Sequence, residues 1–483
     1  MVSLWAREEM ASVDLGDERL DARSAMLLSS LGNRPNLSIP SACGGRAEME
    51  AAYRFFDNDK VRFDKLLASH VQRTLERLGE HPVALLVNDT TEIELMRPQQ
   101  QVEGVGQLND SRQGVLLHVL HAFTPDGTPQ GTVAAHYLNR TDGVCDAPKA
   151  HKRKSRKHQP IEQKESMRWL TDLRQAREIA GKLLLSQCIY IADSEADIYE
   201  LFCEPRKLGQ SDKEIDWLIR ACQNRALEGE GQSEHRHLRE QVLASPALYE
   251  MELLIRARQA KTEVEKRARR KKRDSRAARV EVRATTVTLR PPWRPEGKLP
   301  QVSFNVVLVR ECNPPAGEEA VEWILVTTLP IQTLEQVRQV VEHYCVRWNI
   351  EILFRTLKSG CRIEQRRFEH VDRIVRCMGL YLIVAWRTLF VCRSARECPQ
   401  ADCETIFEPS EWKATWVAVH GKKPPKKRPR LREMVHLVAR LGGYVERNNS
   451  EPGPQTVWIG LQRMYDLAWA WDAFGPAAKL RAS

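Results

Sequence analysis

The sequence predicts an α/β fold built on a mixed sheet, with helical segments before and after it. Short apolar runs of strand length alternate with helical patterns in the middle of the chain, and a strong turn signal at residues 124–128 joins two runs into a hairpin. Hairpin strands followed by alternating helix and strand are typical of a sheet with antiparallel and parallel neighbours. The expected strands are 83–87, 114–123, 131–138, 188–192 and 217–221, and the expected helices between them are 160–180 and 196–202.

The chain has 483 residues, which is enough for roughly three domains at about 150 residues each. Residues 1–70 read as short helices with basic and aromatic residues near their surface. Residues 71–375 contain the α/β sheet, and the regular alternation stops at about 224–330, which we interpret as a β-rich insertion. Residues 376–483 return to helical patterns.

The charge balance is basic, with 74 Lys and Arg against 64 Asp and Glu and a pI near 9.0. This excess alone is weak support for a polyanionic partner, but clusters at 149–158 and 266–273 favour phosphate contacts over solvated loops if the protein acts on DNA. The first residues carry charges unlike a signal peptide, and no run of eighteen apolar residues occurs. We therefore expect a cytoplasmic protein with no membrane partner.

A predicted helix over 334–359 carries the most informative pattern. At about 100° per residue, Tyr344, Arg347, Glu351 and Lys358 share an arc of roughly 60°, and Trp348 lies beside it. Apolar residues at 346, 350, 353 and 357 fall on the opposite side, as expected for a core-facing back. Spacing alone fits a solvated face with ordinary ion pairs equally well.

Two aspartates give this face a possible function. Asp89 and Asp193 each follow an apolar strand, and the carboxyl ends of strands are where open α/β sheets place their sites. Either acid alone could simply start a turn or cap a helix. Glu195 and Asp197 are also acidic, so the sequence alone does not decide which of these three acids would belong to a functional site.

Together, Asp89, Asp193 and Glu351 would form an oxygen-only cluster. Three close carboxylates repel one another unless divalent cations neutralise them, and oxygen ligands select Mg²⁺ or Mn²⁺. Two ions about 4 Å apart would suit phosphodiester displacement. Arg347 and Lys358 would then hold neighbouring phosphates, and Tyr344 could donate a hydrogen bond to another.

The helix spacing Tyr344-x₂-Arg347-x₃-Glu351-x₆-Lys358 resembles the signature of the hairpin-forming DDE transposases of bacterial insertion sequences. Asn88-Asp-Thr-Thr91 is similar to the family's first aspartate motif, and Asp193-Ser-Glu-Ala-Asp-Ile198 to its second. Further similar segments, in the same order, are Leu15-Gly-Asp-Glu-Arg19, Ala52-Tyr-Arg-Phe55, Glu322-Trp-Ile-Leu-Val-Thr-Thr328 and Ala439-Arg-Leu-Gly-Gly443.

This resemblance implies a ribonuclease H-like fold, with the β-rich insertion placed before the glutamate helix. It implies that Asp89, Asp193 and Glu351 form the catalytic triad and bind two Mg²⁺ ions, for which Mn²⁺ would substitute. The implied reaction is cut-and-paste transposition: nicking at inverted-repeat ends, hairpin formation, hairpin opening, and joining of the 3′ ends to target DNA.

The resemblance also implies DNA contacts. Tyr344, Arg347 and Lys358 would grip phosphates, while Trp323 would receive a base flipped out of the hairpin and Trp348 would add stacking. Trp323 also sits on an apolar strand, so a plain core role stays open.

Further basic residues match the family's DNA-contacting positions. Arg23 and Arg54 match its end-recognition module. Arg220 matches a basic residue after the strand, whereas a neighbouring lysine is absent here and its role could have moved to Arg225. Residues 457–474 resemble the family's dimerisation helices, which implies a homodimer holding two double-stranded DNA ends in a paired-end complex, associated with the nucleoid.

Two other functions are compatible with parts of this pattern. A different ribonuclease H-like metal nuclease would need neither the helix signature nor Trp323. A non-catalytic regulator derived from a transposase would bind DNA without cutting it, although all three candidate carboxylates are present.

Overall fold

The protein is described by a computed structural model that covers residues 2–97, 101–140, 159–207, 209, 213–228, 236–255, 275–294, 297–447 and 450–476. The basic clusters at 149–158 and 266–273 lie outside the described residues. The chain forms two compact units, and the first combines Met1–Lys149, Leu183–Ser186 and Trp348–Ser483. The second combines Ala150–Lys182 and Gln187–Arg347.

The first unit begins with five helices, as the N-terminal pattern predicts. Polar caps start two of them, because Asp17 accepts a hydrogen bond from the Arg19 amide and Ser38 accepts one from the Ser41 amide. The fifth helix runs past residue 70, so the expected domain boundary falls inside it. The helices are α1 (Leu4–Glu9), α2 (Glu18–Asn33), α3 (Ile39–Cys43), α4 (Arg46–Asp57) and α5 (Phe63–Leu78).

Four strands follow in the same unit, in the order β2-β3-β1 with β4 on β3. All of these pairs are antiparallel, and the turn at 124–128 joins β3 to β4 as predicted. Helices α5 and α13 pack against β4. The strands are β1 (Val83–Glu94), β2 (Gln107–Asn109), β3 (Arg112–Phe123) and β4 (Pro129–Leu138).

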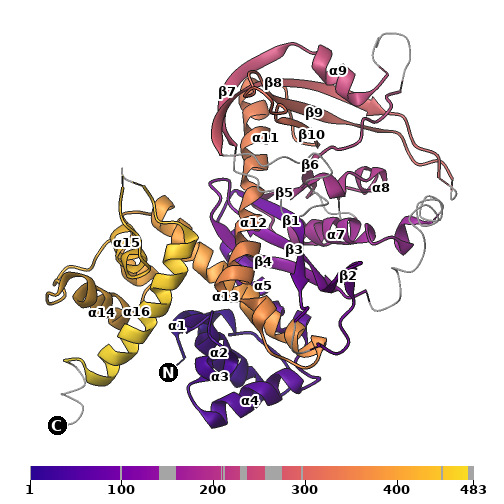
Figure 1. Ribbon diagram of the computed structural model, residues 1–483. Helices are drawn as coiled ribbons and strands as arrows, with labels where there is room; N and C mark the ends of the chain where they lie inside the picture. Colours follow the sequence, from indigo (N-terminus) through magenta and orange to yellow (C-terminus); the bar gives the residue numbers. More distant parts are fainter. Residues whose placement is uncertain are drawn as a thin grey trace. The chain divides into compact units, whose positions relative to one another are not determined.

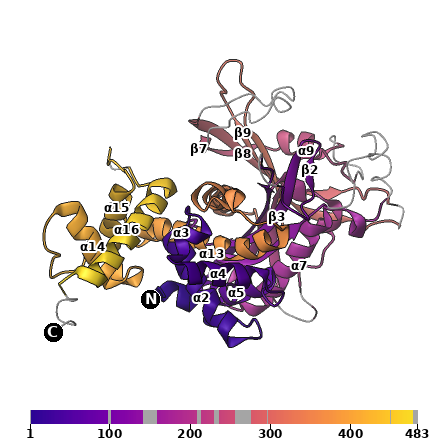
Figure 2. The same ribbon diagram turned by 60° about the horizontal axis from the view of Figure 1, so that its bottom comes forward.

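The long helix α13 (Val371–Glu397) is the core helix of the first unit. Figure 2 shows it beside α2, α4 and α5, against which it packs. It is the one described helix long and apolar enough to cross a membrane, but 83% of its most apolar window is buried inside the protein. Such burial is typical of the central helix of a folded domain.

A buried polar network joins α1 to this core. The Thr132 amide donates to His70 Nε2 (3.0 Å), so the imidazole proton lies on Nδ1 and is donated to Glu9 Oε2 (2.5 Å). Arg77 donates to Glu9 Oε1 (2.7 Å) and lies over the Trp386 ring of α13 at 4.3 Å. Burial raises the pKa of Glu9, but the contacts with His70 and Arg77 outweigh it, and the net shift is downward.

The chain ends in three helices, α14 (Pro409–His420), α15 (Leu431–Leu441) and α16 (Pro454–Phe474), which lie side by side in Figure 1. Their apolar faces share one core with the end of α13. Glu411 is buried in the first turn of α14, where its carboxylate accepts from the Glu408 amide (2.7 Å). Burial raises the pKa of Glu411 to about 7.

We expect this carboxyl to make the protein less stable as the pH rises. Between the unfolded pKa of 4.5 and about 7, the folded state keeps the Glu411 proton and the unfolded state loses it, so the free energy of unfolding falls by about 3 kcal/mol. Above that range the Glu411 contribution is constant. Glu411→Gln cannot ionise, so the loss relative to wild type should disappear when urea unfolding is measured from pH 4.5 to 8. Parallel pH profiles of the two proteins would contradict this expectation.

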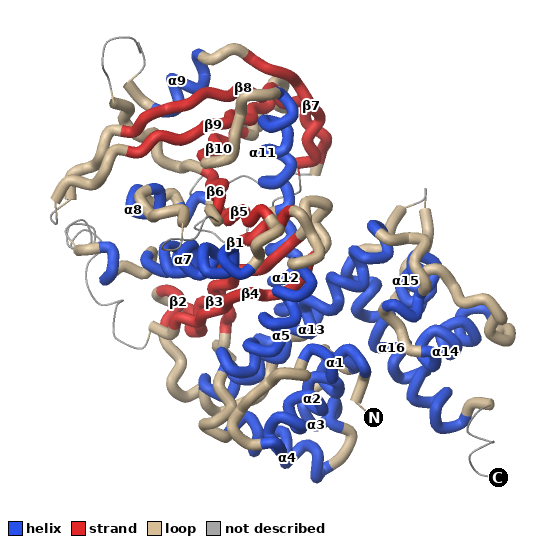
Figure 3. The backbone as a smooth tube through the Cα atoms, turned by 180° about the vertical axis from the view of Figure 1, so that it is seen from behind, coloured by secondary structure: helices blue, strands red, loops and turns tan. Residues whose placement is uncertain are grey.

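The second unit carries a mixed sheet in the order β5-β6-β10-β9-β8-β7. β5 and β6 are parallel and the other pairs are antiparallel. Figure 3 shows the long strands β7–β9 side by side, with α11 (Leu334–Val346) across them. The strands are β5 (Gln187–Ala192), β6 (Ile215–Arg220), β7 (Ala247–Ile255), β8 (Arg276–Leu289), β9 (Val302–Glu311) and β10 (Glu322–Thr327).

Three further helices belong to the second unit. α7 (Met167–Lys182) packs against β5 and β6, α8 (Tyr199–Phe202) packs against α7, and α9 (Leu238–Ala244) packs against β8 and β9. The segment 224–330 is β-rich as expected. It is not a separate layer, because β10 pairs with β6 and so extends the same sheet.

Candidate active site

Asp89 lies in the middle of β1, not at its end as expected. The strand continues to Glu94, and Asp89 pairs with Val119 of β3. The apolar run stops at residue 87 because one face of the second half of β1 is less buried. Buried and half-buried residues therefore alternate in that half of the strand. Asn88 is fully buried and donates to the Val119 carbonyl (3.4 Å), while the half-buried Asp89 carboxylate accepts from the Thr90 amide (2.7 Å).

The expected uniform helix over 334–359 is wrong in two places. α11 ends at Val346 with Arg347 as its C-cap, and α12 (Trp348–Arg355) follows directly. The last turn, Thr356–Gly360, is π-helical and closes with a bond from the Cys361 amide to the Thr356 carbonyl (2.8 Å). A wider turn rotates less per residue, so an arc calculated at 100° per residue does not hold for Lys358.

The helix α12 brings Glu351 to β1. Its apolar residues Ile350 and Leu353 are fully buried, as the predicted apolar back requires, whereas Glu351 is half-buried. α12 packs against β1, the strand that carries Asp89, and both belong to the first unit. The structure therefore places two of the three candidate carboxylates on neighbouring elements.

A buried asparagine fixes the start of α12. Asn349 donates to the Gly127 carbonyl (3.3 Å) and accepts from Arg393 of α13 (3.0 Å). Gly127 has φ +87°, and a Cβ there would lie 2.6 Å from the Asn349 amide nitrogen, so the turn needs glycine on both grounds. We did not predict a role for Asn349, although a polar residue next to an apolar face was a usable signal.

Asp193 follows β5 directly, as predicted. It is half-buried and caps the short helix Ser194–Ala196, because its Oδ1 accepts from the Glu195 amide (2.8 Å). Arg220, the last residue of β6, donates to the Ser194 hydroxyl (3.3 Å) and so stands beside this turn. Asp193 belongs to the second unit, whereas Asp89 and Glu351 belong to the first.

The neighbouring acids have other partners. Asp197 is fully buried, and its carboxylate accepts from the Cys222 and Gln223 amides and from Arg225 (2.6 Å). Glu195 is 61% exposed and pairs with Arg168 at 2.7 Å. The geometry therefore favours Asp193 among the three acids as the candidate ligand.

Arg225 is largely buried, with 11% of its side chain exposed. Besides its pair with Asp197, its guanidinium lies near the rings of Phe202 and Tyr199, at 5.3 and 5.9 Å. These contacts give Arg225 a structural role, because they hold Asp197 at the end of the short helix that follows Asp193. The DNA contact of Arg225 stays a prediction.

Trp323 on β10 lies next to the predicted helix face. Its ring meets that of Tyr344 edge-on at 5.4 Å, and the Arg347 guanidinium is 6.0 Å from the Tyr344 ring. Trp323 is half-buried and packs against the small cluster of Ile255, Ala278 and Val321, so it is neither a pure core residue nor a free surface residue. Tyr344 and Arg347 are both buried, with 4% and 8% exposed.

The other candidate DNA contacts lie in two parts of the chain, the segment around α12 and the N-terminal helices. Trp348 and Lys358 are half-buried in α12 and in the π-helical turn. Arg23 is half-buried on α2, and Arg54 is exposed in the last turn of α4. Both therefore belong to the N-terminal helices, as predicted.

The described residues contain no group of three or more His, Cys, Asp or Glu side chains arranged to hold a metal ion. The convergence of Asp89, Asp193 and Glu351 therefore stays a prediction. Their donor set still fits one kind of ion, because it offers carboxylate oxygens and no nitrogen or sulfur.

Comparison with protein families matches three parts of the chain. Residues 3–61 match a model described as "Transposase DNA-binding", and residues 154–387 match "Transposase DDE domain". Residues 383–469 match "Transposase Tn5 dimerisation domain". The chain has the domain composition of a DDE transposase.

The matches place a DNA-binding domain over helices α1–α4 and a dimerisation domain over the C-terminal helices. The DDE domain contains Asp193 and Glu351, whereas Asp89 lies between the matched segments. The match to the DDE domain and the mixed sheet of the second unit are consistent with the ribonuclease H-like fold of DDE transposases.

Proposed function

We propose that the chain excises a transposon from DNA and joins it to a new site by the cut-and-paste route. The observation that carries this proposal is the order of its domains: DNA-binding helices, a DDE domain and a dimerisation domain in one chain. A simple nuclease would need no dimerisation domain of this type, and a simple regulator would need no DDE residues. We expect the protein to act in the cytoplasm, on the nucleoid.

We further propose that Asp89, Asp193 and Glu351 hold two Mg²⁺ ions, with Mn²⁺ as an effective substitute. The contact between α12 and β1 supports this assignment for Glu351 and Asp89, and the position of Asp193 directly after β5 supports it for the third ligand. When bound, the ions would activate an attacking oxygen and stabilise the leaving oxygen of a phosphodiester.

The proposed reaction has four steps, each of which breaks one P–O bond and forms another. Water cleaves one strand at the transposon end and leaves a 3′-hydroxyl. That hydroxyl attacks the opposite strand, forming a hairpin and releasing the flanking DNA. A second water opens the hairpin, and the regenerated 3′-hydroxyl attacks a phosphodiester of the target.

The chain's own residues would position DNA during these steps. Arg347 and Lys358 would bind backbone phosphates, and Tyr344 would donate a hydrogen bond to another phosphate oxygen. Arg23 and Arg54 would contact the inverted-repeat end. In the proposed paired-end homodimer, each protomer would cut the end that its partner mainly recognises.

Paired-end excision by the purified full chain tests this function. The DNA substrate should carry two copies of the inverted repeats that flank the coding frame, and the products are separated on denaturing and native gels with Mg²⁺. We expect a nick, then a hairpin, then a released transposon, and finally joined target DNA. Nicking without hairpins or joining would favour another ribonuclease H-like nuclease, and binding without cleavage would favour a regulator.

We expect Trp323→Ala to slow hairpin formation by about 10- to 100-fold while changing first-strand nicking much less. A base stacked on an aromatic ring contributes about 1–3 kcal/mol, and the flipped base is needed for the hairpin step only. Single-turnover gels that resolve nick and hairpin measure both rates. Trp323→Phe keeps an aromatic ring and should recover most of the hairpin rate, whereas equal slowing of both steps by Trp323→Ala would contradict the base-flip role.

A further inference from the structure

The dimerisation domain contains a strongly basic segment, residues 420–440. It carries eight Lys or Arg side chains and one acidic residue, Glu433. The formal net charge of this segment is therefore +7, compared with +10 for the whole chain. Such a density of like charge is unfavourable for the protein alone and indicates a polyanionic partner.

The first half of this segment is a loop between α14 and α15. Gly421, with φ +63°, ends α14, and the Pro424–Pro425 pair separates two lysine pairs. The four lysines, at 422, 423, 426 and 427, are all exposed, and none makes an ion pair within the part of the chain that the structure describes. In contrast, Arg428 pairs with Asp402 and Glu404, at 3.2 and 3.1 Å.

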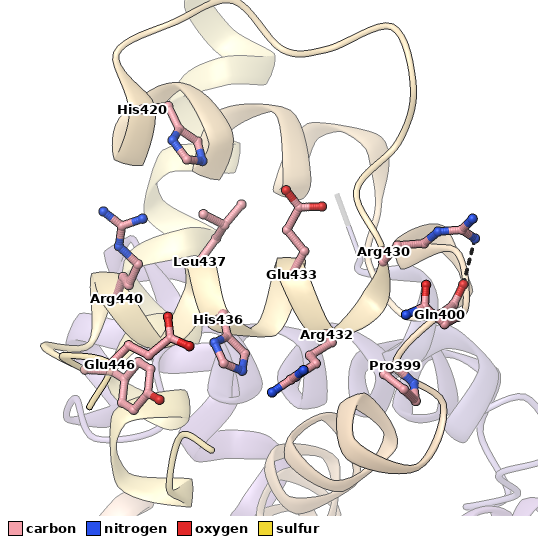
Figure 4. A pocket seen from close by; sticks show the side chains of 11 residues that line it. Pro399, Gln400, His420, Arg430, Arg432, Glu433, His436, Leu437, Arg440 and Glu446 are labelled. Carbon is pink, nitrogen blue, oxygen red and sulfur yellow. Dashed lines mark hydrogen bonds between the residues drawn. The ribbon is translucent and has the colours of Figure 1, made fainter. Parts of the chain in front are cut away.

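The second half lines a pocket of about 560 Å³ beneath the loop. Figure 4 shows Arg430, Arg432 and Arg440 spaced along α15 and its start, with His420 at the end of α14 on the side of Arg440. Arg430 donates to the Gln400 carbonyl (2.7 Å), which is a neutral acceptor. Glu433 and Glu446 are the acidic residues of the lining.

The nearby carboxylates neutralise only part of this charge. Glu451 pairs with Arg432 (2.7 Å) and with His436 (3.2 Å). Asp402 and Glu404 form ion pairs with Arg428. The four lysines of the loop therefore stay available together with Arg430 and Arg440.

We propose that the basic segment 420–440 binds the phosphate backbone of target DNA, without reading its sequence. Lysine ammonium groups are compact point charges, and contacts to phosphates position DNA but carry no sequence information. This property suits a target of arbitrary sequence, whereas the segment matched as transposase DNA-binding, to which we assign the transposon end under the proposed function, is separate and lies at residues 3–61. The identity of the duplex as target rests on the proposed function, but its binding does not.

The test replaces the four loop lysines together in the full chain (K422Q, K423Q, K426Q and K427Q). Binding of a short duplex of unrelated sequence is followed by fluorescence anisotropy over a salt series without divalent metal. Each phosphate contact contributes about 0.9 to the steepness of log affinity plotted against log salt concentration. Losing two to four contacts should therefore make this slope less steep by about 2–4. The charge-retaining variant (K422R, K423R, K426R and K427R) should keep the wild-type slope.

Two further readouts separate the possible results. Nicking of a transposon end should be unchanged in the Gln variant, while joining of pre-cut ends should need about tenfold more target DNA for half-maximal rate. An unchanged salt slope would overturn the proposal, and so would loss of the dimer in sedimentation, which would indicate a protein–protein contact instead. If wild type bound unrelated duplex through this segment yet never cut a transposon end, the inference would survive and the proposed function would fail.

Discussion

Replacing Asp89, Asp193 or Glu351 by alanine, one at a time, should abolish cleavage of the transposon end while leaving DNA binding intact. Each carboxylate is proposed to hold a metal ion that stabilises transition-state charge, and losing about 4 kcal/mol of that stabilisation slows nicking about a thousandfold. Binding should survive because the segment matched as transposase DNA-binding, residues 3–61, contains none of the three carboxylates. Nicking rates and mobility shifts of the same preparations measure the two effects.

The matched control is Glu195→Ala. Glu195 lies two residues from Asp193 and is also acidic, but it is exposed and paired with Arg168. Its removal should change nicking only a few-fold. A Glu351→Ala variant that cut DNA normally would exclude Glu351 as a ligand, and a Glu195→Ala variant as inactive as Asp193→Ala would show that the wrong acid was chosen.

Glu9→Ala should lower the free energy of unfolding by about 3–5 kcal/mol. The substitution leaves the buried Arg77 and His70 without their carboxylate, and breaking one side of a buried ion pair is much more costly than removing the whole pair. The folded pKa of Glu9 is lowered, so its contribution is present above the unfolded value of 4.5 and is lost as the pH falls through the folded value. The difference from wild type should therefore shrink in acid, and urea unfolding at neutral and acidic pH measures it.

Glu8→Ala is the control for this prediction. Glu8 neighbours Glu9 on α1 but is exposed, so its loss should cost within about 0.5 kcal/mol. If Glu9→Ala were as mild as Glu8→Ala, the network that joins α1 to α5 and β4 would contribute little to stability.

Much of the fold could be predicted from the spacing of apolar residues and from the residues typical of turns. The hairpin around 124–128, the strand before Asp193 and the apolar back formed by Ile350 and Leu353 all follow from local patterns that agree with burial in the structure. β7 could not be predicted in this way. Its Ala, Leu, Met and Glu residues favour helix, and pairing with β8 overrides that preference.

The candidate site was less accessible to sequence reasoning, because its geometry depends on tertiary contacts. The end of β1 is set by pairing with β3, and the position of α12 by the Asn349 bonds to Gly127 and Arg393. For Arg225, the sequence predicts a phosphate contact but gives no sign of its buried partner, Asp197; the phosphate contact stays a prediction. Charge type is readable from sequence, but the partner that neutralises it is not.

The most direct test of the proposed chemistry is a crystal structure of the full chain with a transposon end and Mn²⁺, with the ions located by anomalous scattering. We predict two manganese ions, with at least one carboxylate oxygen of each of Asp89, Asp193 and Glu351 bound to them at about 2.0–2.3 Å. Manganese bound elsewhere, with any of the three carboxylates turned away from the ions, would contradict the proposed site.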